Sequence, residues 1–123
     1  MKKILFTLAF FAATLHLQAA DIAPIITAFK SGNADLFKGM MAADVDLVTP
    51  DVSKKGNADE AIAHLKKIFQ THKPTGFTVA HHADKNDSGF VVGKLTTANR
   101  DFRVNITYTV KDGKMLITII RIE

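Results

Sequence analysis

Residues 101–122, DFRVNITYTVKDGKMLITIIRI, determine the fold of this chain. From Phe102 to Val110, apolar residues alternate with Arg, Asn and Thr, which is the period of a strand with one buried and one polar face. Asp112-Gly113 is a strong signal for a two-residue hairpin turn, and a second apolar run follows it. The stretch therefore predicts an antiparallel hairpin of two strands, over 101–110 and 114–122.

The turn also predicts which residues pair across this hairpin and therefore which face each one occupies. Residues on the inner face point toward a core, and those on the outer face alternate with them. The predicted inner pairs are Val110 with Met115, Tyr108 with Ile117, and Ile106 with Ile119.

Upstream of the hairpin, the period of two continues back to Pro74 and predicts two more strands, over 76–83 and 89–97. Before Pro74 the apolar spacing is helical. A first helix runs from Asp21 to a stop at Ser31-Gly32, and Asn33 can cap a short second helix. A strand over 45–49 follows, and Asn57 with Glu60 opens a long third helix that Pro74 ends. The apolar positions of these helices are Ile22, Ile25, Ile26 and Phe29 in the first, Leu36, Phe37, Met40 and Met41 in the second, and Ala58, Ala61, Ile62, Leu65, Ile68, Phe69 and His72 in the third.

Three helices can cover only one side of such a sheet, so the outer face is expected to carry an exposed apolar patch. A patch of this kind usually has a partner, and we expect a homodimer through it. The residues that the predicted register assigns to this interface are Phe90, Val92, Leu116, Ile120 and Ile122.

The N-terminus has the layout of a secretory signal: Met1-Lys2-Lys3, an apolar run from Ile4 to Leu17, and Gln18-Ala19-Ala20. The run is shorter than the roughly 20 residues of a membrane-spanning helix, so we expect cleavage after Ala19 or Ala20. Residues 21–123 would then form a single α+β domain that is periplasmic or secreted. The chain has no Cys, which excludes lipid attachment through cysteine and leaves stability to packing alone.

Charge excludes some partners for the mature domain. Without Lys2 and Lys3, the 16 Lys and Arg residues of the chain fall to 14, against 12 Asp and Glu. This balance is too weak for a surface that follows phosphates, so we expect no nucleic acid partner, and no membrane association once the signal is removed.

Metal and cofactor sites are not expected either. His81 and His82 are neighbours on a strand and point to opposite faces, so they cannot share one ion. The segment Asp84–Gly89 begins like a calcium loop, but Leu95 stands at the twelfth position, where a bidentate Glu is required. The sequence leaves open which of the two histidines faces inward.

The order of elements, two helices, a strand, a long helix and an antiparallel meander, resembles the cone-shaped fold of nuclear transport factor 2-like proteins. Several short segments are similar to a family of short exported bacterial proteins, domain of unknown function 4783. This resemblance implies an α+β cone in which N-terminal helices pack on one face of a curved antiparallel sheet. It implies export and no known activity. The segments that carry it are Gly32-Asn33-Ala34, Val45-Asp46-Leu47, Gly93-Lys94-Leu95-Thr96-Thr97, Phe102-Arg103-Val104, Lys111-Asp112-Gly113-Lys114 and Arg121-Ile122-Glu123.

In this cone fold, the long helix and the inner face of the sheet often enclose an apolar cavity. We assign no catalytic residue and expect a non-catalytic module that binds a small apolar ligand or a protein. The alternative is a cofactor-independent isomerase, dehydratase or hydrolase that uses this cavity, with Asp46 as the candidate base. A carboxylate or histidine beside Tyr108 in an open void would favour the enzyme, and a filled core would exclude it. The residues predicted to bind a ligand in the cavity are Phe69, His72, Gly93, Ile106 and Tyr108.

Overall fold

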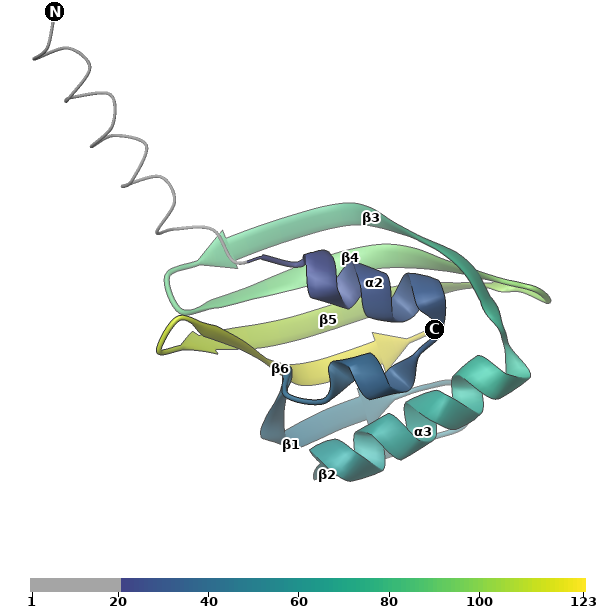
Figure 1. Cartoon of the computed structure of the whole chain (residues 1–123), viewed down its shortest axis with the longest axis horizontal. Helices are drawn as coiled ribbons and strands as arrows, with labels where there is room; N and C mark the ends of the chain where they lie inside the picture. Colours follow the sequence, from purple (N-terminus) through teal and green to yellow (C-terminus); the bar gives the residue numbers. More distant parts are fainter. Residues whose placement is uncertain (1–20) are drawn as a thin grey trace, which may run out of the picture.

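The helices within residues 21–123 lie on one face of a curved six-stranded sheet (Figure 1). The computed structural model describes residues 21–123, and the predicted export signal at 1–20 lies outside them. Within the described range, no helix is long and apolar enough to cross a membrane. The elements are α2 (Ala23–Ser31), η1 (Ala34–Phe37), β1 (Met41–Val48), β2 (Ser53–Asn57), α3 (Ala58–Thr71), β3 (Pro74–Lys85), β4 (Ser88–Thr97), β5 (Asp101–Lys111) and β6 (Lys114–Ile122).

Both long helices begin and end where the sequence predicts. In α2, Pro24 occupies the first turn, and the helix ends at Gly32, whose φ of 66° is a left-handed conformation that glycine adopts without strain. In α3, the side chain of Asn57 accepts a hydrogen bond of 2.9 Å from the backbone N–H of Glu60. This bond satisfies one of the free N–H groups in the first turn and fixes the start of the helix.

The second predicted helix is shorter than expected. Asn33 caps it, accepting a hydrogen bond of 3.1 Å from the N–H of Asp35, but only the 3₁₀ helix η1 forms. The backbone leaves helical geometry at Lys38, whose ψ is 130°, Gly39 follows with a φ of 83°, and Met41 begins β1 instead. Leu36, predicted to face the core, is 42% exposed.

The sheet has the strand order β2-β1-β6-β5-β4-β3. The four strands predicted after Pro74 form the expected antiparallel meander, and β1 contains most of the strand predicted over 45–49. Strand β1 runs parallel to β6, so the sheet is mixed rather than wholly antiparallel. Strand β2, with the sequence SKKGN, was not expected, because it has no alternation of apolar and polar residues.

A β-bulge changes the predicted register of the last hairpin. Tyr108 pairs with Ile117 as expected, but the register then shifts by one residue, so that Ile106 faces Ile120 rather than Ile119. Because successive strand residues point to opposite faces, the shift moves Ile120 and Ile122 to the inner face. They are 0% and 1% exposed, while Ile119 is 39% exposed on the outer face. The prediction that Ile120 and Ile122 face outward is therefore wrong.

Aromatic rings fill the space between the helix layer and the sheet. The ring of Phe29 on α2 stacks on Phe77 of β3 with centroids 5.0 Å apart. The rings of Phe37 and Phe69 meet Phe29 edge-on, at 5.1 and 6.0 Å. Such contacts add to the stabilisation from apolar burial, and they join both helices and η1 to the inner face of the sheet.

Candidate functional site

Aromatic rings fill the space between Phe69 and Gly93, two of the residues predicted to line an inner cavity. Phe69 is buried and packs edge-on against Phe29, which stacks in turn on Phe77. A Cβ atom added to Gly93 would lie only 2.4 Å from Cζ of Phe77. The absent side chain of Gly93 therefore makes room for the Phe77 ring, and the expectation that it leaves room for a ligand in an inner cavity is wrong.

The other predicted cavity residues separate into two places. Ile106 and Tyr108 lie on the inner face of β5, and both are fully buried. His72, by contrast, sits at the C-terminal end of α3, where its Nδ1 lies 2.8 Å from Oδ1 of Asn99. Its ring also meets the Phe102 ring edge-on at 4.9 Å. His72 thus fastens α3 to the turn between β4 and β5 instead of facing a shared cavity.

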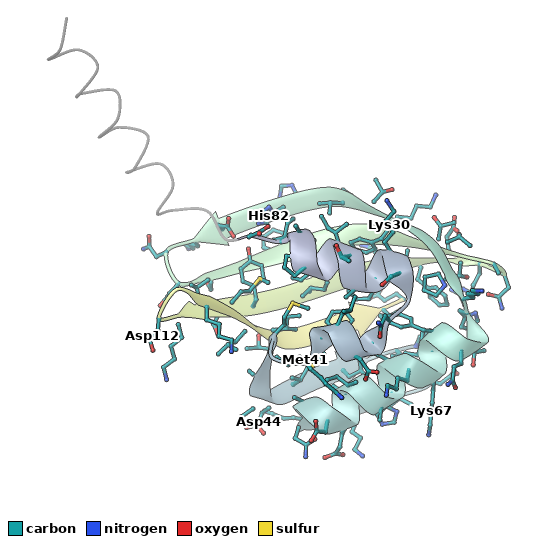
Figure 2. The ribbon with its side chains drawn as sticks, in the orientation of Figure 1. Lys30, Met41, Asp44, Lys67, His82 and Asp112 are labelled. Carbon is teal, nitrogen blue, oxygen red and sulfur yellow. The ribbon has the colours of Figure 1, made fainter. Side chains whose placement is uncertain are left out.

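Two polar side chains, from Asp84 and His82, contact the hydroxyl of Tyr108 and form a three-residue cluster with it. The hydroxyl donates a hydrogen bond to Oδ1 of Asp84. Nε2 of His82 lies 3.0 Å from the Tyr108 hydroxyl oxygen and 3.1 Å from Oδ1 of Asp84. Figure 2 labels His82, and its pairing with the buried Val91 shows that it, rather than His81, faces inward.

The surroundings of Tyr108 keep its hydroxyl protonated. Burial raises the pKa of the phenol well above its usual range, and the hydrogen bond to Asp84 and the charge of that carboxylate raise it further. The hydroxyl already donates its hydrogen bond to Asp84. The Tyr108 hydroxyl is thus engaged within the protein and is poorly suited to protonate a bound molecule.

Gly89 positions this hydroxyl. Strand pairing places Gly89 directly opposite Tyr108, and a Cβ atom there would lie 2.5 Å from the hydroxyl oxygen and 2.7 Å from the carbonyl oxygen of Ala83. Only glycine leaves this space open. The sequence does not predict this cluster, because the facing of His82 depends on a bulge in β3 that no residue type indicates.

Asp46, the candidate base, does not belong to the cluster. It pairs with Ile119 of β6 and with Lys55 of β2, whereas the next residue, Leu47, pairs with the buried Ile120. Asp46 therefore points to the outer face, and its assignment to the inner cavity is wrong. Among residues 21–123, no three His, Asp or Glu side chains gather closely enough to hold a metal ion.

The outer face of β3, β4 and β5 contains a hollow of about 690 Å³, which we call the outer groove. It lies where the register of β3 shifts between Val79 and His81, and this bulge brings Ala80 into the wall. No residue type in β3 predicts this bulge. The residues that line the outer groove are Ala80, His81, Phe90, Val92, Gly93, Lys94, Asp101, Phe102 and Arg103.

Apolar side chains and charged side chains occupy different parts of the outer groove. Phe90 is 38% exposed, and its ring lies 5.4 Å from that of His81 at an angle of 47°. Nζ of Lys94 forms an ion pair of 3.2 Å with Asp101. Arg103 is exposed on the outer face of β5. The groove therefore combines an aromatic surface with a charged end.

Three of the five residues predicted to form a dimer interface lie on this same outer face. Phe90 is exposed, and Val92 and Leu116 are half-buried. Ile119 joins them in place of the two buried isoleucines.

Comparison with known proteins identifies close relatives by structure and sequence. A family model for a domain of unknown function, DUF4783, matches residues 22–123. A DUF4783 family protein from Bacteroides ovatus is 36% identical, with a TM-score of 0.77 over 81% of this chain and 91% of its own. One from Bacteroides fragilis is 33% identical, with a TM-score of 0.79 over 84% of this chain and 97% of its own. A search of curated proteins found no match.

More distant structures share the fold alone. An NTF-2 like protein of unknown function from Silicibacter pomeroyi is 14% identical, with a TM-score of 0.63 over 95% of this chain and 97% of its own. The predicted α+β architecture with a nuclear transport factor 2-like fold is confirmed. With the family model covering nearly all described residues and relatives above 30% identity, the chain belongs to the DUF4783 family.

Proposed function

We propose that this protein is an exported, non-catalytic binding module that holds a small, largely apolar molecule in the outer groove. The observation that carries the proposal is the groove itself, a hollow of about 690 Å³ on the outer face of β3, β4 and β5. Pockets for small molecules commonly measure about 300–1,000 Å³. The exposed ring of Phe90 gives such a molecule an apolar surface to cover.

The packing of the inner face favours the outer groove, and not an inner cavity, as the ligand site. Phe77 occupies the space beside Gly93, and Phe29 separates Phe77 from Phe69. Well-packed interiors of this kind leave few voids larger than a water molecule. A ligand on the inner face would have to displace these rings, whereas a ligand in the outer groove would not.

One observation favours the rival function, a cofactor-independent enzyme. Asp84 and His82 lie within hydrogen-bond distance of Tyr108, and enzymes often combine such groups as acid and base. We favour the binding module because these groups already satisfy one another, and because the Tyr108 hydroxyl keeps its proton.

The homodimer stays a prediction, and a second copy is the other occupant that this face allows. With the corrected register, its apolar contacts would come from Phe90, Val92, Leu116 and Ile119. Phe90 and Val92 also line the outer groove, so a dimer through them would cover it. Sedimentation distinguishes the two occupants, since a mass of two chains that Phe90→Lys reduces to one would identify a second copy.

The proposal is tested by titrating the purified protein with N-phenyl-1-naphthylamine, an uncharged probe whose fluorescence rises in apolar surroundings. We expect saturable binding that Val92→Arg weakens by about tenfold or more, because the arginine would fill the groove. Thr109→Arg is the matched control: Thr109 is exposed on the same face but does not line the groove. No saturable binding by the wild type, or equal loss in both variants, would overturn the proposal.

A further inference from the structure

We propose that the ligand of the outer groove is a small aromatic carboxylate, with Arg103 as the group that binds its negative charge. This inference rests on the proposed function, because it assigns a chemical class to the same site. Charged side chains lie at one end of the groove and aromatic rings at the other.

The charged end of the groove begins with two cations on neighbouring strands. Lys94 of β4 lies directly opposite Arg103 of β5, and both side chains are exposed on the outer face. Like charges placed directly opposite each other destabilise a sheet unless an anion compensates them. Asp101 compensates Lys94, through an ion pair of 3.2 Å. Among residues 21–123, Arg103 forms no such ion pair with a residue of β4.

On its other side, Arg103 has Glu123 as its neighbour. The backbone N–H of each residue donates a hydrogen bond of 2.9 Å to the carbonyl oxygen of the other. The side chain of Glu123, however, pairs with Nε of Arg121 at 3.5 Å. Within residues 21–123, no carboxylate oxygen lies within 4.0 Å of the Arg103 guanidinium nitrogens. Its planar set of donors is therefore open to a carboxylate, which it can bind through two parallel hydrogen bonds.

The other end of the groove suits an aromatic ring. The rings of His81 and Phe90 are tilted at 47° to each other, and Phe90 is 38% exposed. Aromatic rings pair favourably in stacked or edge-to-face arrangements, so a ligand ring can lie against Phe90 and above Val92. The result is a site with an apolar body and a single well-placed charged group, which is the usual composition of a small-molecule pocket.

The spacing of the two ends limits the size of the ligand. Phe90 and Lys94 are four residues apart on β4, and Arg103 lies opposite Lys94. Four residues of strand span about 13 Å. The long side chain of Arg103 covers part of this distance, so a fused two-ring carboxylate is a better fit than benzoate.

The experiment compares two probes with the same ring system, 2-naphthoate and the uncharged 2-naphthalenemethanol, by isothermal titration of the purified protein. We expect 2-naphthoate to bind about fivefold more tightly than the alcohol at low salt, with the advantage shrinking as salt rises. Arg103→Gln should remove the advantage, because it weakens binding of 2-naphthoate much more than binding of the alcohol. Lys111→Gln is the matched control, since Lys111 is an exposed cation on the same strand that does not line the groove, and it should leave both affinities unchanged.

A second variant tests the inference even if Arg103→Gln does not fold. Asp101→Asn should raise the affinity for 2-naphthoate alone, because it frees Lys94 from its ion pair. If the wild type bound both probes equally and Val92→Arg bound neither, the ligand would not be a carboxylate, but the groove would still be the binding site. Tighter binding of the alcohol would also overturn the carboxylate. Failure of both probes, together with failure of N-phenyl-1-naphthylamine, would overturn the proposed function itself.

Discussion

The hydroxyl of Tyr108, a side chain with no exposed surface, donates its hydrogen bond to the carboxylate of Asp84. This bond crosses from β5 to β3, past the intervening strand β4, and Gly89 of β4 leaves the space for it. Three strands are thus joined at one end of the sheet by a polar contact within an apolar face. A buried hydroxyl without a hydrogen-bond partner would lower the free energy of unfolding by about 1–3 kcal/mol, and the bond to Asp84 avoids this loss.

The first prediction concerns alkaline pH. The pKa of Tyr108 is raised in the folded protein above the value of about 10 expected for the unfolded chain. The neutral phenol is therefore favoured by folding, so its contribution to stability is fully present below pH 10 and is lost as pH rises above it. The free energy of unfolding should fall by up to about 1.4 kcal/mol per pH unit from this group.

Tyr108 is the only tyrosine of the chain, so tyrosinate absorbance reports on it alone. We expect the absorbance to rise only when the protein unfolds, at a pH above 10. In Tyr108→Phe, the unfolding free energy should be lower by about 1–2 kcal/mol at neutral pH and less dependent on alkaline pH. Titration of Tyr108 near pH 10 in the folded protein would contradict this account of its surroundings.

The second prediction concerns the space beside Gly93. Gly93→Ala should lower the free energy of unfolding by about 1–3 kcal/mol, because its Cβ would overlap the Phe77 ring. Phe77→Leu should cost stability by itself but cost less in the Gly93→Ala background, and chemical denaturation of the four proteins measures this coupling. Gly76→Ala is the control, since nothing lies within 4 Å of its Cβ position. Additive losses would show that Phe77 does not occupy this space.

The third prediction tests the bulge in β6. Ile120→Lys should lower the free energy of unfolding by more than about 4 kcal/mol or prevent folding, because it buries a charge at a position with no exposed surface. Ile119→Lys, one residue away and 39% exposed, should change it by no more than about 0.5 kcal/mol. Thermal unfolding of the two variants compares them directly. The opposite order of stabilities would support the register without a bulge.

The fourth prediction concerns the N-terminus. If residues 1–20 are an export signal, protein recovered from the periplasm or medium of expressing cells should begin at Ala20 or Asp21. Intact-mass measurement of the secreted and retained fractions tests this. A full-length mass in the exported fraction, or no export at all, would argue against a cleaved signal.

Periodicity predicted the elements well, because burial of one face forces a regular pattern on the sequence. Phe102 to Val110 alternates along its whole length, and the Asp112-Gly113 turn and the Asn57 cap have distinct local chemistry. Strand β2 was missed because its side chains are almost all exposed, so no pattern marks it.

The errors at the candidate site come from β-bulges, which no pattern of residue types in the sequence indicates. One inverted the facing of Ile119 and Ile120. Another, between Val79 and His81, lies at the outer groove and precedes His82, whose facing the sequence leaves open. A bulge adds one residue to one strand and depends on tertiary packing more than on residue type. The sequence likewise does not predict that Phe77 fills the space beside Gly93. The two residues lie on neighbouring strands, and the sequence leaves the register of these strands open.

The central claim, that the ligand binds outside the sheet and not beneath the helices, is tested most directly by amide chemical shifts during titration with N-phenyl-1-naphthylamine. We predict that the largest changes occur at Ala80, Phe90 and Val92, which line the outer groove. Changes confined to Phe69, Ile106 and Tyr108, on the inner side, would contradict the claim.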